Sequence, residues 1–414
     1  MCLSGARMSI FAVLLLAIVL TIALLRIKLP IGPAIIASGL LIWCLTDPSW
    51  HILSGAAYRV ITASRTYDLI LALYFVVCLE IELRKSGCLS GMLRYLNHWI
   101  PSTKLMLAAM PAFLGLLPSV GGARFSAPIV EQTAEGLGLS QEHKSAINYW
   151  FRHVFEFASP IVPGMILACA INNIAVGELI RHMIWVSVSA IVVGWFVLLR
   201  PIREPREFRH EKIQDEAQRR HCRTDFCMCL CPILIILILM VAFGISASIS
   251  IGCVSAVMLV LLRYSHRQVG LLEVYVGAIE MRLFRDVGCI LVFIEILVGT
   301  GTLAAVVSSM SSAPLPAAVI LAGISFIIGL LTGITQGTVA IVMPLAAALS
   351  SSGALELVGI VLVFGMAGQM FTPTHLCLTV TVDYFQASLL RTLGYVAAVQ
   401  SIVVIIFSAV TYIS

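Results

Sequence analysis

The chain alternates between long apolar runs and short polar connections over its whole length. One longer polar stretch, from Arg200 to Asp225, separates two sets of apolar runs that are similar in number and order. Several runs approach the roughly 20 apolar residues that a helix needs to cross a bilayer. The pattern therefore predicts an all-α polytopic membrane protein, with the lipid bilayer as its main partner.

The two sets of runs contain matching positions at a nearly constant offset in numbering. The offset from Gly115-Leu-Leu to Gly329-Leu-Leu is 214 (329 − 115), and the offset from Phe157 to Phe371 is also 214 (371 − 157). Similar offsets separate Ile31-Gly32 from Ile251-Gly252, and Asp68 from Asp286. This spacing predicts an internal repeat with one copy on each side of the polar stretch.

In each half, a glycine-containing break joins two rather short apolar runs, which we interpret as a re-entrant hairpin that enters and leaves the membrane on one side. Five full spans and one hairpin per half make the number of crossings odd, which predicts two inverted-topology repeats. Each repeat would also contain one broken helix. The predicted domains are a first repeat at 1–200 (hairpin 104–136, broken helix 145–180), a basic cytoplasmic linker at 201–225, and a second repeat at 226–414 (hairpin 314–350, broken helix 355–391).

The distribution of Lys and Arg predicts the orientation. Cytoplasmic loops of membrane proteins carry an excess of these residues. With the linker in the cytoplasm, the other loops on that side contain Arg26, Lys28, Arg84, Lys85, Arg94, Lys104, Arg263, Arg267, Arg282, Arg285 and Arg391. The outside segments contain only Arg7, Arg59, Arg65 and Arg181, and 301–316 has no charge. The bias predicts ten spans in the cytoplasmic (inner) membrane, with both termini outside.

Composition narrows the function. Only 11% of the residues are charged, whereas about 25% are charged in a typical soluble protein. The net charge of +5 comes from loops beside predicted spans, so it does not indicate nucleic-acid binding. Cysteines 222, 227, 229 and 231 lack the spacing of a zinc ribbon. Because no phosphate-binding loop, nucleophile elbow or zinc-protease motif occurs, we expect no enzyme, no cofactor and no metal site.

A long span with an internal break follows each predicted hairpin. The first break is Phe157-Ala-Ser-Pro-Ile-Val-Pro-Gly164, and the second is Phe371-Thr-Pro-Thr-His375. Proline removes a helix hydrogen bond and disfavours helix in the residue before it. Carbonyl and hydroxyl oxygens freed in this way suit Na⁺, and helix N-termini suit an anion. Two hairpin tips and two breaks predict a four-part transport site near the membrane midplane.

Charged and titratable residues near these breaks have a functional and a structural interpretation. An intramembrane charge such as Arg124 is a functional hypothesis by default. Arg124 binds a substrate carboxylate, or it pairs with an internal acid such as Glu156. Glu156 in turn binds a coupling cation or proton, or it partners an arginine. His153 and His375 flank the two breaks and titrate near neutral pH, or they make helix–helix hydrogen bonds. Glu295 stands alone in a predicted span, with no assigned role.

The paired hairpins and proline-broken spans resemble the ion transporter superfamily, which includes dicarboxylate, citrate, gluconate and arsenite carriers. The segments Pro118-Ser-Val-Gly-Gly-Ala-Arg-Phe-Ser-Ala-Pro128 and Phe371-Thr-Pro-Thr-His-Leu-Cys-Leu-Thr379 are similar to a branch of ten-span prokaryotic proteins of unknown function within it. The hairpin tips lack the Asn that the dicarboxylate carriers have. The related carriers are often dimers, so a homodimer is one state that the resemblance implies.

We therefore expect a secondary active transporter that moves a small organic anion, a carboxylate or sugar acid, by alternating access with Na⁺ or H⁺. The alternatives are a cation/proton antiporter that uses Glu156 and His375, and a non-transporting membrane scaffold. The predicted substrate-binding residues are Ser119, Gly121, Gly122, Arg124, Thr335, Gln336, Thr374 and His375. The predicted coupling-ion residues are Ser119, Glu156, Ser159, Pro160, Thr332, Thr335, Thr372 and Pro373.

Overall fold

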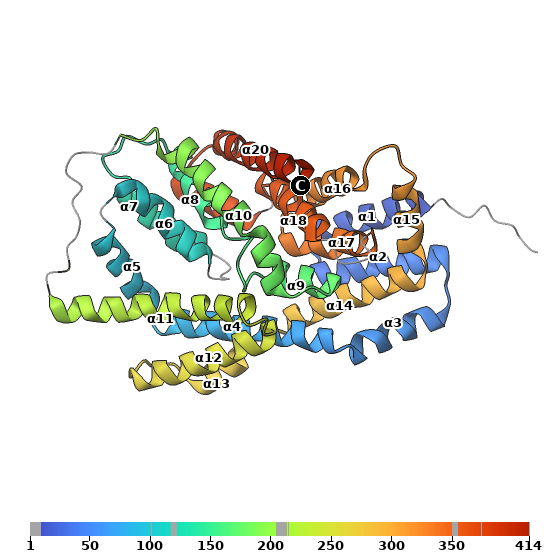
Figure 1. The fold of residues 1–414 in the computed structure, drawn as a ribbon, viewed down its shortest axis with the longest axis horizontal. Coiled ribbons are helices and arrows are strands. Elements are labelled where there is room, and N and C mark those ends of the chain that lie inside the picture. The colour runs from blue at the N-terminus through green and yellow to red at the C-terminus, as the bar shows by residue number, and fades with distance from the viewer. Residues whose placement is uncertain are drawn as a thin grey trace, which may run out of the picture. The chain divides into compact units, whose positions relative to one another are not determined.

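The structure is a computed structural model that describes residues 10–100, 102–116, 122–203, 213, 215–349, 355–373 and 375–413. The described residues form helices and contain no strand (Figure 1). The helices before the linker are α1 (Ile10–Arg26), α2 (Ile31–Thr46), α3 (Trp50–Thr62), α4 (Ser64–Lys85), α5 (Cys88–Trp99), α6 (Thr103–Gly115), α7 (Gly122–Thr133), α8 (Gln141–His153), α9 (Pro163–Asn172), α10 (Val176–Gly194) and the π-helix η1 (Trp195–Leu199). Those after it are α11 (Glu216–Val241), α12 (Ala247–Tyr264), α13 (Leu271–Gly277), α14 (Met281–Gly299), α15 (Thr302–Ser311), α16 (Ala317–Thr332), α17 (Thr335–Leu349), α18 (Leu355–Met370), α19 (Leu376–Phe385) and α20 (Leu389–Ile413).

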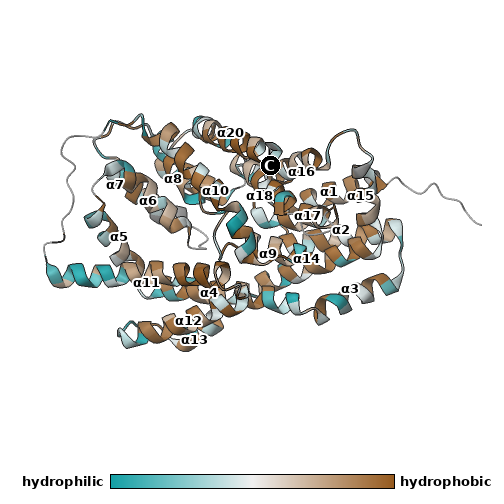
Figure 2. Ribbon diagram, viewed as in Figure 1, coloured by the Kyte–Doolittle hydropathy of each residue, from teal (hydrophilic) through white to brown (hydrophobic). Residues whose placement is uncertain are grey.

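Apolar helices long enough to cross a bilayer occur in both halves. Within the described ranges, four helical stretches have this length and composition: Val176–Leu199, Glu216–Val241, Ala247–Tyr264 and Leu389–Tyr412. A fifth is formed if Leu271–Gly299 and Thr302–Met310, bent by 71° at their junction, act as one span. Most of the other apolar helices are shorter, at 10–17 residues. Figure 2 shows α11 with a hydrophilic first part and a hydrophobic remainder. An all-helical, membrane-embedded protein is therefore supported, while ten spans stay a prediction.

The chain folds into two compact units, and each takes segments from both halves of the sequence. Unit 1 comprises Met1–Ile70, Ala170–Asn173 and Glu280–Gln369. Unit 2 comprises Leu71–Cys169, Ile174–Ile279 and Met370–Ser414. The predicted repeats 1–200 and 226–414 are therefore not the compact units. They remain a prediction about the order of helices along the chain.

Unit 1 packs the first helices of the chain against helices of the second half. Helix α2 lies against α14, and α3 also contacts α14. The α2–α14 approach is close, because a Cβ built on Gly32 would lie 2.6 Å from the Cα of Asp286. Helices α16 and α17 pack on each other as a hairpin, and α1 contacts α15. Glycine in α2 thus permits a contact that a side chain would prevent.

Unit 2 contains the corresponding contacts with the halves exchanged. Helix α5 packs on α11, and α6 and α7 form a hairpin. A Cβ on Gly252 of α12 would lie 2.8 Å from the ring of Phe75 in α4. Gly32 and Gly252, which the sequence repeat pairs, therefore both permit a close helix contact with the opposite half. Helices α8, α19 and α20 also pack together in unit 2, where they hold the candidate functional residues described next.

Two packed helix pairs lie within 104–136 and 314–350, the ranges in which re-entrant hairpins are predicted. The first consists of α6 and α7, and the second of α16 and α17, which a break at Gly333 and Ile334 separates. Gly333 ends α16 in a left-handed conformation, with φ of 69°, which glycine adopts at little cost. These are packed helix pairs, and a short break at Gly333 and Ile334 separates the helices of the second pair. Whether they enter and leave the membrane on one side, and whether the repeats are inverted, stay predictions.

Candidate functional site

The first predicted break separates α8 from α9. Helix α8 ends at His153, and regular α-helix resumes only at Pro163. The backbone between them makes short turns, with Glu156 N–H donating to the His153 carbonyl and Ala158 N–H donating to that of Phe155, both at 3.1 Å. Ser159 is buried, and the exposed fraction of Phe157 is 3%. Regular helix is thus interrupted inside the protein between His153 and Pro163, in the segment where a break is predicted.

The second predicted break separates α18 from α19. Helix α18 ends at Met370, and α19 begins at Leu376 with His375 as its N-cap residue. The His375 N–H donates to the Thr372 carbonyl at 3.2 Å. Thr372 and His375 are both buried, whereas Pro373 is exposed. The break therefore brings buried polar side chains to the start of α19.

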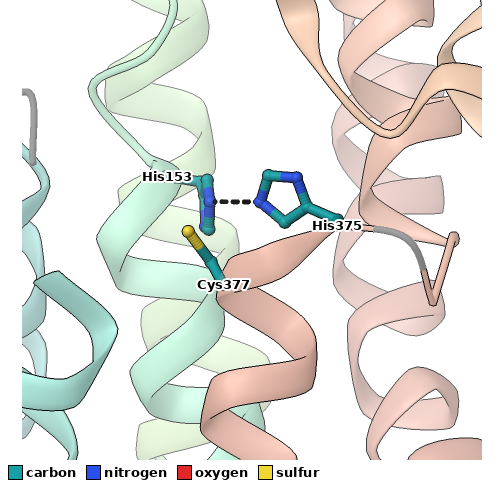
Figure 3. A group of neighbouring side chains, drawn as sticks. All are labelled: His153, His375 and Cys377. Atoms are coloured by element: carbon teal, nitrogen blue, oxygen red, sulfur yellow. Dashed lines mark hydrogen bonds between the residues drawn. The ribbon is translucent and has the colours of Figure 1, made fainter. Parts of the chain in front are cut away.

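The two breaks, one from each half of the sequence, bring two histidines together within unit 2 (Figure 3). His153 Nε2 lies 3.0 Å from His375 Nε2, although the residues are 222 positions apart. His153 Nδ1 lies 2.6 Å from the Tyr149 carbonyl oxygen. Because a carbonyl only accepts, His153 Nδ1 carries the proton and donates it. With both rings neutral, His153 Nε2 then accepts a hydrogen bond from His375 Nε2–H.

Cys377 completes a cluster with the two histidines. Its sulfur, one ring nitrogen of His153 and one ring nitrogen of His375 all lie within 4.8 Å of one another. Both histidines are buried, and Cys377 is partly buried. Figure 3 shows the three side chains directed toward one another, His153 from the end of α8 and Cys377 from the first turn of α19. We name His153, His375 and Cys377 the break cluster.

Aromatic and polar groups of unit 2 surround the break cluster. The Tyr149 ring packs on both histidine rings, at centroid distances of 4.8 Å and 5.7 Å. One carboxylate oxygen of Glu156 lies 3.9 Å from His153 Nε2. Immediately before Tyr149, Asn148 Nδ2 donates to Thr381 Oγ1 at 3.1 Å, which ties α8 to α19. Packing and hydrogen bonds thus fix the relative position of α8 and α19 within this unit.

In unit 2, the first hairpin packs on α8 just before its break. Gly115, the last residue of α6, lies so close to α8 that an added Cβ would overlap the Arg152 carbonyl oxygen. The buried Arg152 guanidinium donates to the Leu114 carbonyl at 3.2 Å. An arginine inside an apolar protein needs such acceptors. The hairpin and the first broken span are therefore joined through both backbone and side chain.

In unit 1, the second hairpin packs on α18 in the same manner. A Cβ on Gly329 of α16 would overlap the Gly365 carbonyl oxygen of α18. Thr335 Oγ1, at the start of α17, donates to Gln369 Oε1 at 2.9 Å, one residue before α18 ends. Thr332 Oγ1 donates to the Ile328 carbonyl at 2.8 Å. Gly115 and Gly329, which the sequence repeat pairs, thus have equivalent contacts.

The predicted site residues fall in four groups. Glu156, Ser159, Pro160, Thr372, Pro373 and His375 belong to the two breaks in unit 2, and Thr332, Thr335 and Gln336 belong to the second hairpin in unit 1. Gly122 and Arg124 belong to α7, where the Arg124 side chain lies outside the described part of the chain. Ser119, Gly121 and Thr374 lie outside the described residues. Glu156, His375 and residues of the first break are thus close together, and the complete four-part site remains a prediction.

Sequence reasoning gave no role to Glu295, which the structure places in an ionic cluster of unit 1. Its two carboxylate oxygens lie 2.5 Å from Arg59 Nε and 3.1 Å from Arg65 Nη2. These side chains line a cavity of about 210 Å³ whose wall also includes Leu291 and Pro344. Glu295 is isolated in the sequence but paired in space. Its partners belong to α3 and α4, 236 and 230 positions earlier, and no local pattern indicates them.

Sequence reasoning also missed Glu82, a fully buried acid in unit 2. Its Oε1 accepts a hydrogen bond from Ser255 Oγ at 2.8 Å, and its Oε2 has no hydrogen-bond partner among the described residues. Burying a carboxyl group with one oxygen unpaired is costly, because burial removes its hydration. The sequence feature that could have identified Glu82 is its position within the apolar run of α4.

A comparison with known protein families gives a match over almost the whole chain. The family model described as "Protein of unknown function (DUF401)" matches residues 7–413. Both halves and the linker lie inside the match. No curated protein matches the chain. The family description states no activity.

Proposed function

Starting from the fact that the chain belongs to the DUF401 family over residues 7–413, we propose that it is a secondary transporter of a small organic anion. Transport would be driven by Na⁺ or H⁺ and would proceed by alternating access. The observation that carries the proposal is the meeting of the two helix breaks, with His153 and His375 3.0 Å apart.

Broken helices inside a membrane protein need a reason. In lipid, unpaired backbone groups cost several kcal/mol each, so irregular backbone persists where protein buries it or where it lines a cavity. Here two spans from different halves break, and their breaks meet in unit 2. Transporters place substrate and ion sites at such paired breaks. Prolines that merely kink separate helices would not bring the two breaks together.

The hairpins support the same proposal. Gly115 and Gly329 each remove a side chain where a hairpin meets the broken span of its own half. The contact positions each hairpin beside the end of a helix that breaks, at Arg152 in unit 2 and at Gln369 in unit 1. Two equivalent hairpin contacts of this kind are what the predicted four-part site requires.

The groups at the breaks suit an anion and a cation. Helices α9 and α19 begin at the breaks and present backbone N–H groups there. Arg152 adds a buried positive charge at the first break. The hydroxyls of Ser159 and Thr372 are buried beside irregular backbone, and hydroxyl and carbonyl oxygens suit Na⁺. These features favour an organic anion as substrate.

A ligand screen followed by uptake measurements tests the proposal. The purified protein would be heated with a panel of carboxylates, sugar acids and oxyanions, with and without Na⁺. A substrate at 100 times its dissociation constant stabilises the folded state by about 2.7 kcal/mol. We expect at least one acid to raise the unfolding temperature and to be accumulated by proteoliposomes under a Na⁺ or H⁺ gradient. No thermal shift and no uptake with any acid would contradict the proposal and favour a membrane scaffold.

Variants make the test specific. Arg124→Ala should abolish uptake of the identified acid, since the substrate would lose its partner in the first hairpin. Arg391→Ala is the matched control, because the Arg391 side chain is 81% exposed and belongs to the first turn of α20, outside both breaks. Unchanged uptake in Arg124→Ala would remove this residue from the site. Dissipation of a pH gradient by Na⁺ alone, with no acid present, would identify a cation/proton antiporter instead.

A further inference from the structure

We propose that the break cluster binds one transition-metal ion of the Zn²⁺ class, with His153 Nε2, His375 Nε2 and the Cys377 sulfur as ligands. The inference concerns binding alone and does not depend on the transport proposal. Imidazole nitrogen and thiolate sulfur are the donors that Zn²⁺ and similar ions prefer, whereas Na⁺, Mg²⁺ and Ca²⁺ take oxygen.

The distances are close to those of a metal site. Tetrahedral coordination with Zn–N bonds of about 2.05 Å separates two ligating nitrogens by about 3.3 Å. The two Nε2 atoms lie 3.0 Å apart, and all three ligand atoms lie within 4.8 Å of one another. Small side-chain rotations would therefore be enough to enclose an ion. Figure 3 shows the sulfur and the two rings converging on one space.

A second observation concerns the orientation of His153. Its Nδ1–H donates to the Tyr149 carbonyl oxygen at 2.6 Å, which directs the lone pair of Nε2 toward the cluster. Metal-ligating histidines nearly always donate their other N–H to a carbonyl or carboxylate in this way. The buried Tyr149 ring packs against both imidazoles and restricts their rotation. The first ligand is thus held in the required tautomer before an ion arrives.

The position of Cys377 suits a thiolate. It is the second residue of α19, and the positive end of a helix dipole stabilises a negative sulfur. On binding, the Cys377 thiol would release its proton to solvent, and the His375 proton would move from Nε2 to Nδ1 so that its Nε2 could ligate. One proton is released per ion. Three protein ligands leave a fourth position, which faces either a water molecule or the Glu156 carboxylate 3.9 Å from His153 Nε2.

Cobalt provides a direct test, because a Co²⁺–thiolate bond gives a sulfur-to-metal charge-transfer band in the near ultraviolet. The purified full-length protein, kept reduced, would be titrated with Co²⁺ and then with Zn²⁺. We expect the band to saturate at one Co²⁺ per chain and to disappear when Zn²⁺ displaces the cobalt. A pH indicator in weakly buffered solution would report one proton released per ion. A titration that gives no charge-transfer band would overturn the proposal.

Ligand variants and a matched control locate the ion. Cys377→Ser should abolish the charge-transfer band, and His153→Gln or His375→Gln should weaken binding more than about 100-fold, beyond the loss typical of an outer-shell partner. Cys169→Ser replaces another buried unit 2 cysteine, which lies in α9, and should leave the titration unchanged. Each variant would first be checked for the helical content and elution volume of the parent. A band that persists in Cys377→Ser would place the metal on other thiols, such as Cys227 and Cys231, and would overturn the assignment.

Discussion

Each of the two hairpins contacts the broken span of its own half through an equivalent glycine, but the polar groups at the two contacts differ. Gly115 in unit 2 and Gly329 in unit 1 each lie against a carbonyl oxygen of the following broken span. Beside Gly115, the charged Arg152 binds the end of α6, whereas the neutral pair Thr335 and Gln369 joins the start of α17 to α18. The backbone contact is repeated and the side-chain chemistry is not. The shared glycine contact therefore maintains the packing of each hairpin on its span. Any difference in what the two hairpins bind comes from their different side chains.

The difference has a physical basis. A helix contact at a glycine depends only on the absence of Cβ, so it survives wherever glycine is kept. A buried guanidinium instead needs several acceptors and is retained only where they are supplied. Arg152 has one in the Leu114 carbonyl. The equivalent region of unit 1 uses hydroxyl and amide groups, which are less costly to bury.

The largest effect is expected from replacing the repeated glycines. Gly115→Ala and Gly329→Ala should each destabilise the protein by about 3 kcal/mol or more, because backbone atoms would have to move apart. Gly323→Ala in α16 is the matched control, since an added Cβ there meets no atom within 4 Å. It should stabilise slightly, by up to about 1 kcal/mol. Thermal unfolding in detergent measures all three, and a large loss in only one of the two glycine variants would break the equivalence.

A smaller loss is expected from Arg152→Leu. The change removes the donor to the Leu114 carbonyl and should cost about 1–3 kcal/mol, the usual penalty for leaving a buried polar group unsatisfied. It should also reduce uptake, because the charge lies at the first break. Arg152→Lys keeps the charge but loses the planar guanidinium, and it should recover part of both losses. Full stability in Arg152→Leu would show that the first hairpin does not depend on this contact.

Thr335→Val tests the neutral counterpart in unit 1. The variant loses one hydrogen bond to Gln369, and we expect a stability loss of about 0.5–1.5 kcal/mol. Thr335→Ser keeps the hydroxyl and serves as the control. The comparison of the hairpins predicts that Thr335→Val is milder than Arg152→Leu. The reverse order in unfolding temperature would contradict it.

The smallest effect concerns an exposed ion pair that joins the halves within unit 2. Lys85 Nζ lies 2.7 Å from Glu273, and this ammonium lowers the pKa of the Glu273 carboxyl. A carboxyl with a lowered pKa in the folded state contributes stability above its unfolded pKa and loses it as pH falls through the folded pKa. We therefore expect the unfolding temperature of the parent protein to drop slightly below about pH 4.5, and we expect this drop to be absent in Glu273→Gln. An identical acid profile in both proteins would show that the pair contributes nothing.

The sequence was informative about features that depend on residues close together in the chain. Prolines 160, 163 and 373 disfavour helix in the residues before them, so an interruption could be predicted near each of them, although Pro111 and Pro232 lie inside helices. Gly115 and Gly329 could be paired because the predicted repeat places them at the same offset as Phe157 and Phe371. The hairpins followed from short apolar runs joined by a break, and their helices α6–α7 and α16–α17 are present and packed.

The spatial partners could not be predicted, because they are set by contacts between distant segments. Nothing near His153 indicates that it meets His375, 222 positions later. Glu295 looked unpaired, since Arg59 and Arg65 precede it by 236 and 230 positions. In the sequence, Cys377 is one of several cysteines in apolar runs, and only the structure places its sulfur near two imidazoles. A single sequence gives periodicity and spacing, but it contains no direct record of such pairs.

The exchange of segments between the halves has a consequence for biosynthesis. Gly32 of α2 rests against Asp286 of α14, which belongs to the other half of the chain. At about 5–20 residues per second, a ribosome needs roughly 13–50 s to synthesise the interval between these two positions. During this time the newly inserted α2 has α1 beside it but lacks α14, so the glycine face that later meets α14 is open to lipid, the translocon or a chaperone. Nascent chains arrested before α14 should therefore be the species that membrane quality control recognises.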